Sequence, residues 1–179
     1  SGGLTCSFPR SVGQVPLNYN HRNTGRPVLG EGIRQFAEAY KSNYIDQTNE
    51  ALYPFGYGLT YSQVEYKDLK VIKPNIKMSE SLELEITVEN IGEQDCCEIV
   101  QLYIRDLVAQ TARPVKELKA FQKLALKAGE SRRVKFSLPC KDLGYYNWNN
   151  TYQVDAGDFS LWVGASSQAK NHAQFKLEA

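Results

Sequence analysis

The chain has 179 residues, of which 42% are hydrophobic and 23% are charged, and its formal net charge is +1. This length suits one ordinary domain plus a remainder, or two small domains. The Lys and Arg residues are scattered along the sequence, which argues against a nucleic-acid partner. No apolar run approaches the roughly 20 residues that span a bilayer, which argues against a membrane protein.

The sequence begins at Ser1, and its single methionine is Met78. No basic and apolar signal segment opens the chain. We therefore expect either a processed protein or a piece of a longer one.

Residues 1–60 show no repeating strand pattern and are rich in Pro, Gly and Asn. Between Gly32 and Asn43, apolar residues recur at i, i+3, i+4 and i+7, which predicts one short helix. These residues are Ile33, Phe36, Ala37 and Tyr40. A compact domain rarely contains sixty residues with so little regular structure. This segment is therefore interpreted as the end of a larger domain.

Residues 52–62 form an uncharged aromatic run, Leu-Tyr-Pro-Phe-Gly-Tyr-Gly-Leu-Thr-Tyr-Ser. Gly56 and Gly58 allow the backbone to turn tightly, and Pro54 restricts the approach to that turn. We expect the rings to be buried between the first segment and the domain downstream of residue 62. These rings belong to Tyr53, Phe55, Tyr57 and Tyr61.

Downstream of residue 62, short alternating runs succeed one another with turns between them. The clearest is 82–88, where Leu82, Leu84, Ile86 and Val88 alternate with polar residues. Further strands are predicted at 99–104, 121–126, 134–138, 152–154, 159–163 and 173–177, and 99–104 is apolar enough for a central strand. About seven short antiparallel strands are typical of an immunoglobulin-like or fibronectin type III-like β-sandwich. Tyr145 or Tyr146 could supply the tyrosine-corner contact of such a fold.

The residues that usually carry chemistry do not converge in this sequence. His21 and His172 lie in different segments, and Cys6, Cys96, Cys97 and Cys140 have no C-x-x-C spacing, so we predict no metal site and no cofactor. The carboxylates of the first segment sit in no recognisable motif; they are Glu31, Glu38, Asp46 and Glu50. From the residues alone, the chain is a β-sandwich with an incomplete N-terminal appendage and no catalytic residue.

Several segments resemble glycoside hydrolase family three, the β-glucosidase family. The run 52–62 resembles the family's linker signature, on Pro54, Phe55, Gly56, Tyr57, Gly58 and Tyr61. Segments 3–16, 19–27, 44–46, 100–106 and 113–121 resemble other parts of the same family, in the same order. Gly3 stands where the family usually has Lys or Arg, and Thr5 where proline is common.

The resemblance implies a three-part parent: a (β/α)₈ barrel, an α/β sandwich and a C-terminal fibronectin type III-like domain. Residues 1–62 would be the tail of the α/β domain plus the linker, and 63–179 the fibronectin type III-like domain. The parent would hydrolyse terminal β-D-glucosyl residues by a retaining mechanism with two carboxyl groups. In the family both carboxyl groups come from upstream domains, so no catalytic residue carries over to this chain.

The resemblance also sets the expected partners and compartment. The partners are the missing barrel and α/β domains, the parent's β-glucoside substrate and, as an alternative, a second copy in a homodimer. A periplasmic or extracellular parent is expected. Two competing hypotheses are a carbohydrate-binding module, using Tyr145, Tyr146, Trp148 and Tyr152, and an adhesive fibronectin-like module.

Overall fold

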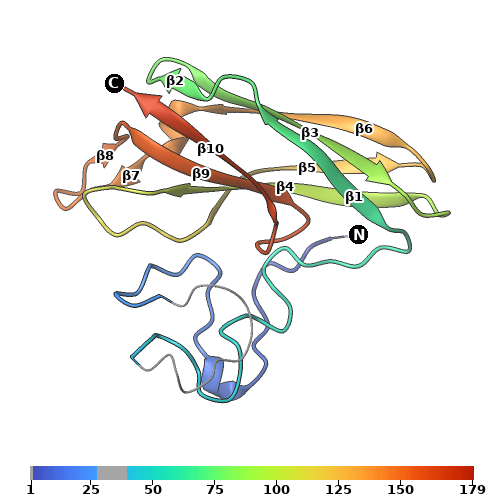
Figure 1. The fold of residues 1–179 in the computed structure, drawn as a ribbon, viewed down its shortest axis with the longest axis horizontal. Helices are drawn as coiled ribbons and strands as arrows, with labels where there is room; N and C mark the ends of the chain where they lie inside the picture. Colours follow the sequence, from blue (N-terminus) through green and yellow to red (C-terminus); the bar gives the residue numbers. More distant parts are fainter. Residues whose placement is uncertain (1, 28–39) are drawn as a thin grey trace.

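The computed structural model describes residues 2–27 and 40–179. From residue 64 onward the chain forms two facing β-sheets, and the described residues before them lie below the sheets as loops with one short 3-10 helix, Val12–Gln14 (Figure 1). The fold is thus the mainly-β, fibronectin type III-like sandwich that the alternating runs predict. The helix predicted between Gly32 and Asn43 falls largely outside the described residues.

One sheet has three strands in the order β1-β3-β6, and the other has five in the order β2-β10-β9-β4-β5. The bounds of the first sheet are Val64–Val71, Ser81–Asn90 and Ser131–Pro139 for β1, β3 and β6. The second sheet comprises β2 (Asn75–Lys77), β10 (Asn171–Glu178), β9 (Gly157–Gly164), β4 (Cys96–Asp106) and β5 (Glu117–Leu126). A short hairpin, β7 (Tyr145–Tyr146) with β8 (Tyr152–Gln153), lies at one end (Figure 1).

The core lies between the sheets and is built by strict alternation. On β3 every second residue is fully buried, and the same holds for Val134, Phe136 and Leu138 on β6. Facing them are aliphatic and aromatic side chains of β4, β9 and β10: Val100, Leu102, Ile104, Phe159, Leu161, Val163, Phe175 and Leu177. Burying this apolar surface is the main source of the sandwich's stability.

Strands β1 and β2 lack an uninterrupted alternating pattern, and both were missed by the sequence prediction. In β1, Asp68 has a positive φ of 54°, and the register with β3 shifts between Lys67 and Lys70. This bulge moves the inward positions from Val64 and Tyr66 to Leu69 and Val71, which breaks the period of two. Strand β2 has three residues and pairs in parallel with β10, so it is too short to show a period.

The described part of the segment before β1, residues 2–27 and 40–63, contains no hydrophobic core of its own. Among its described residues, Gln14, Pro54 and Gly56 are the buried ones. Gln14 donates from Nε2 to the carbonyl oxygens of Thr48 and Glu50 (2.9 and 3.3 Å) and accepts from the Arg10 N–H (2.5 Å). Polar contacts of this kind, rather than apolar burial, hold these loops together.

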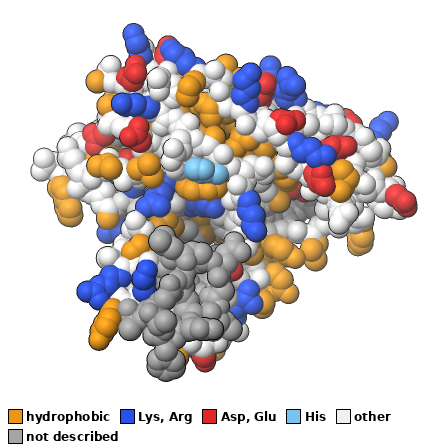
Figure 2. Space-filling view, in the orientation of Figure 1, with side chains coloured by type: hydrophobic (Ala, Val, Ile, Leu, Met, Phe, Trp, Pro, Cys, Tyr) orange, Lys and Arg blue, Asp and Glu red, His pale blue; other side chains and the backbone are white. Residues whose placement is uncertain are grey.

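Charged side chains of both signs are intermixed over the visible face of the sandwich (Figure 2). This agrees with the net charge of +1 and with the scattered basic residues. Within the described residues, no helix has the length and apolar character needed to cross a bilayer.

Asn90, fully buried at the end of β3, links the turn after β3 to the turn after β5. Its Nδ2 donates to the Gln94 and Lys127 carbonyls (2.8 and 3.0 Å), and its Oδ1 accepts from the Gly92 N–H (3.1 Å). Replacing Asn90 by Ala leaves buried main-chain groups without partners, so we expect a loss of about 2–3 kcal/mol in the free energy of unfolding. Urea denaturation measures it. The exposed Asn149→Ala is the control and should change little; equal stability of both variants would contradict this role of Asn90.

Candidate functional site at the aromatic linker

The aromatic linker, residues 52–62, is fixed to the sandwich by one buried side chain, Gln101 of β4. Gln101 is 3% exposed and lies on the outer face of the five-stranded sheet. Its Nε2 donates to the carbonyl oxygens of Gly56 (3.1 Å) and Ala165 (2.6 Å), and its Oε1 accepts from the Tyr103 hydroxyl (2.5 Å). The buried amide is thus satisfied by contacts that join the linker, β4 and the loop after β9.

Gly56 makes this close contact between linker and strand sterically possible. Its φ is +83°, a conformation that favours glycine, and a Cβ added there would lie 2.2 Å from Gln101 Oε1. A Cβ on Gly3 would lie 2.6 Å from the Gly56 carbonyl oxygen. The tight turn predicted at Gly56 is confirmed, and the reason is close approach as much as backbone conformation.

Residues 4–8 run antiparallel to residues 53–57 and extend the attachment. The Leu4 N–H donates to the Tyr57 carbonyl (2.8 Å), and the Gly56 N–H donates back to the Leu4 carbonyl (2.7 Å). Phe8 and Tyr53 form an isolated β-bridge further along. The start of the chain and the linker therefore form one two-stranded unit.

A three-ring contact joins this unit to the outer face of the sheet. Tyr19 stacks on Phe55, with ring centroids 4.1 Å apart, and meets Tyr103 edge-on at 5.9 Å. The Tyr19 hydroxyl accepts from the Leu118 N–H (3.3 Å), and the Ser167 N–H donates to the Phe55 carbonyl (2.9 Å). Aromatic pairs of this geometry stabilise beyond the area they bury, so this contact reinforces the hydrogen bonds of Gln101.

Lys116 holds the loop that receives the linker. Its Nζ donates to the Ser167 carbonyl (2.7 Å) and lies 4.7 Å from the centroid of the Trp162 ring. Burial lowers the pKa of Lys116 to about 8. The ammonium thus stabilises the 165–169 loop through main-chain oxygen and an aromatic face.

The predicted burial of the linker rings is partly right. Pro54 is buried, Phe55 and Tyr57 are half-buried, and Tyr53 is 42% exposed. For Tyr61 the prediction is wrong: the chain bends at residues 61–62 before entering β1, and the Tyr61 ring is 98% exposed. The side chain of Ser62, not that of Tyr61, turns inward, and its hydroxyl donates to Asn90 Oδ1.

The exposed Tyr61 borders a groove of about 780 Å³, which we call the Tyr61 groove. Leu59, 77% exposed, lies on the same groove. The remaining lining comes from Thr60, Asp95, Cys96, Cys97, Ala125, Leu126, Lys127, Glu130 and Arg132. Large apolar side chains exposed side by side mark a surface suited to contact with another protein surface.

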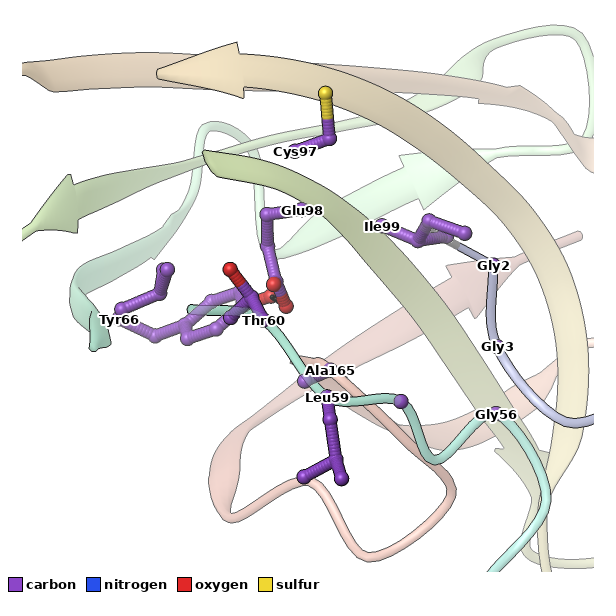
Figure 3. A pocket seen from close by; sticks show the side chains of 12 residues that line it. Gly2, Gly3, Gly56, Leu59, Thr60, Tyr66, Cys97, Glu98, Ile99 and Ala165 are labelled. Atoms are coloured by element: carbon purple, nitrogen blue, oxygen red, sulfur yellow. Dashed lines mark hydrogen bonds between the residues drawn. The ribbon is translucent and has the colours of Figure 1, made fainter. Parts of the chain in front are cut away.

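Next to this groove is a smaller pocket of about 170 Å³ that contains a buried carboxyl group (Figure 3). Tyr66 of β1 donates its hydroxyl proton to Glu98 Oε1 (2.6 Å), and Thr60 lies beside them. Burial raises the pKa of Glu98. Among the residues lining this pocket, Glu98 is the single carboxylate, so the pocket does not hold the carboxyl pair of a glycosidase.

The sequence prediction placed Glu and Asp on the solvated faces of the strands and missed Glu98. The inward position of Glu98 could have been predicted from the alternation of β4, because Glu98 lies two residues from both Cys96 and Val100, which face inward.

The other polar residues considered in the sequence analysis do not converge on one site. Asp46 is exposed, Glu50 is half-buried beside the cleft that contains Lys116, and Glu31 and Glu38 lie outside the described residues. His21 borders the same cleft, whereas His172 packs against Trp162 on the sheet. Within residues 2–27 and 40–179, no group of three potential metal ligands forms.

Comparison with known proteins agrees with this architecture. Residues 98–167 match the family model of the fibronectin type III-like domain. A β-glucosidase from Listeria innocua, whose structure is solved in complex with glucose, superposes with a TM-score of 0.88 at 38% identity, over 99% of this chain and 24% of that one. The fold is therefore a fibronectin type III-like sandwich with its linker and preceding loops attached.

Two curated relatives extend this result to the sequence. The periplasmic β-glucosidase of Salmonella typhimurium is 37% identical over 99% of this chain and 23% of its own length. The thermostable β-glucosidase B of Acetivibrio thermocellus is 38% identical over 94% of this chain and 22% of its own length. The chain thus spans about a quarter of these relatives. It belongs with the C-terminal part of the glycoside hydrolase family three β-glucosidases.

Gly56→Ala tests the contact between the linker and Gln101. The added Cβ collides with Gln101 and also strains a positive φ, whereas in the control Gly129→Ala the φ is +72° with open space around the Cβ. We expect Gly129→Ala to cost about 1 kcal/mol and Gly56→Ala at least twice as much in the free energy of unfolding. Equal losses in urea denaturation would show that Gln101 does not constrain the linker.

Glu98 should make stability depend on pH. Because its pKa is higher in the folded protein than the ordinary value of 4.5, its contribution to stability is fully present below that value. This contribution is lost as the pH rises through the raised folded pKa. The variant Glu98→Gln lacks this loss, so its stability relative to the unmodified chain should increase over that pH range. A difference between the two proteins that is constant with pH would contradict the raised pKa.

Proposed function

We propose that this chain is the non-catalytic C-terminal part of a longer retaining β-glucosidase and has a structural role in that enzyme. This proposal rests on one observation: nearly the whole chain aligns with about a quarter of each β-glucosidase relative. The two carboxyl groups that a retaining glycosidase needs would come from the preceding barrel and α/β domains. The parent's substrate would be a terminal β-D-glucosyl residue.

The proposed structural role has a physical basis in the linker. Residues 1–62, as the tail of the α/β domain, are attached to the sandwich of residues 63–179 through Gln101, Tyr19 and Phe55. A domain that precedes this tail would thereby be held at a fixed position relative to the sandwich. Gly2 lines the pocket adjacent to the Tyr61 groove, so the preceding domain would join the chain close to this groove. We therefore expect the preceding domain to cover the Tyr61 groove.

The compartment and the oligomeric state are further parts of this proposal. The periplasmic relative from Salmonella typhimurium supports a periplasmic or extracellular parent. A second copy of the chain is the alternative occupant of the Tyr61 groove. Sedimentation of the 179-residue chain distinguishes the preceding domain from a second copy as the occupant of the groove. A dimer that Tyr61→Ala disrupts would favour the second copy.

The catalytic part of the proposal is tested with an aryl β-glucoside. The 179-residue chain should give no turnover above buffer, whereas the full-length parent should hydrolyse the substrate with retention of configuration. Turnover that stays with the chain through repurification would refute the non-catalytic assignment.

The structural part is tested by Tyr61→Ala in two contexts. In the 179-residue chain the ring is 98% exposed, so the free energy of unfolding should change by less than about 0.5 kcal/mol. In the full-length parent the same change should lower the melting temperature, because a ring covered by the preceding domains is lost. The exposed Tyr146→Ala serves as the matched control. A full-length Tyr61→Ala enzyme with unchanged melting temperature would show that nothing covers this groove.

A further inference from the structure

The hairpin β7–β8 carries three exposed aromatic rings at the end of the sandwich. Trp148 is 80% exposed, Tyr146 65% and Tyr152 48%. The Tyr146 and Tyr152 rings meet edge-to-face, with centroids 5.2 Å apart. We call these three residues the hairpin aromatics. Exposed rings gathered in this way mark a binding surface.

The hairpin aromatics are held in place by hydrogen bonds at their edges. Trp148 Nε1 donates to the Gln110 carbonyl (3.1 Å), and the Tyr152 hydroxyl donates to the Lys141 carbonyl (2.7 Å). A Cβ on Gly144 would lie 2.6 Å from the Tyr152 ring, so glycine lets that ring lie against the backbone. Ring orientation is thus set before any ligand arrives, which lowers the entropic cost of binding.

The structure beneath the rings is also rigid. Tyr145, 3% exposed, accepts at its hydroxyl from the Gln110 N–H and from Gln153 Nε2 (both 3.0 Å) and donates to Asp155. This hydroxyl is the nearest match to the predicted tyrosine-corner contact, but it bonds to the loop after β4. The hairpin and the Gln110 loop are therefore fixed to each other.

The turn of the hairpin supplies amide groups without charge. Asn147 Oδ1 accepts from the N–H groups of Asn149 and Thr151 (2.9 and 3.0 Å) and shapes the turn. The side-chain amides of Asn149 and Asn150 are exposed and make no hydrogen bond to the described part of the chain. From Gly144 to Gln153 the sequence contains no charged residue. A charged ligand would find no counter-ion on the hairpin itself.

From this geometry we propose that the hairpin aromatics bind a neutral, β-linked oligosaccharide. Fixed ring faces suit the C–H faces of sugar rings, and the Asn149 and Asn150 amides can donate to and accept from sugar hydroxyls. The choice of β-linked glucose rests on the proposed function, whereas the neutral and polyhydroxylated character of the ligand rests on the hairpin. The site would hold neutral oligosaccharide chains at this end of the sandwich.

The test is a titration of the 179-residue chain with cellohexaose, monitored by the indole N–H signals of Trp148 and Trp162 in NMR spectra. The variant Trp148→Phe lacks the Trp148 indole signal, so its spectrum assigns both indole signals. We expect a saturable shift of the Trp148 signal and a constant Trp162 signal. Trp148→Ala and Tyr146→Ala should each weaken binding about tenfold, which corresponds to one stacking contact. Phe121→Ala, which removes an exposed ring (65%) on β5, should leave binding unchanged.

Four results would overturn this inference. A Trp148 signal that does not respond at millimolar cellohexaose is the first, and equal binding by Trp148→Ala is the second. The third is dimerisation of the chain that Trp148→Ala abolishes, which would make the hairpin an interface between copies. The fourth is protection of Trp148 from hydroxyl-radical oxidation in the full-length enzyme, which would identify the preceding domains as the occupant. In each case, hydrolysis of an aryl β-glucoside by the full-length enzyme would leave the proposed function standing.

Discussion

The attachment of the linker depends on the buried amide of Gln101. A primary amide removed from water must find partners for both its oxygen and its nitrogen, because an unsatisfied buried polar group costs about 1–3 kcal/mol. Gln101 finds them in Gly56, Ala165 and Tyr103, which belong to the linker, the loop after β9 and its own strand. Separation of the linker from the sheet would leave this amide without one of its acceptors. The linker is therefore part of the sandwich and not a flexible tether.

This constraint explains other features around it. The Gly56 and Gly3 positions admit no Cβ, because the linker backbone lies directly against the Gln101 side chain and the opening segment lies against the linker. Lys116 stabilises the 165–169 loop that supplies the Ala165 carbonyl and the Ser167 N–H to the same joint. Tyr19 then covers Phe55 and Tyr103 from outside. The described residues of the first segment, few of which are buried, thus gain their order from the sheet against which they pack.

The sequence predicts most of the sandwich because its core strands alternate without interruption. Strands β3 and β6 follow the period of two, and β4 is apolar enough to be recognised as central. Strand β1 was not predicted, because one bulge at Asp68 shifts its inward positions by one residue. The family resemblance locates the linker, yet pattern alone does not distinguish Phe55, which stacks on Tyr19, from Tyr61, which faces solvent. That distinction depends on the bend at residues 61–62 and on the route of the chain into β1, and both are set by the tertiary structure.

The central claim is that the described residues before the sandwich, 2–27 and 40–62, form one ordered unit with it. Amide hydrogen exchange at Leu118, Val115 and Ser167 tests it most directly, because these sandwich N–H groups donate to Tyr19, His21 and Phe55 of the first segment. We predict that all three exchange slowly in the 179-residue chain and become faster in Gln101→Ala, while core amides of β3 stay protected. Exchange of the three amides at the rate of an unstructured peptide would contradict the claim.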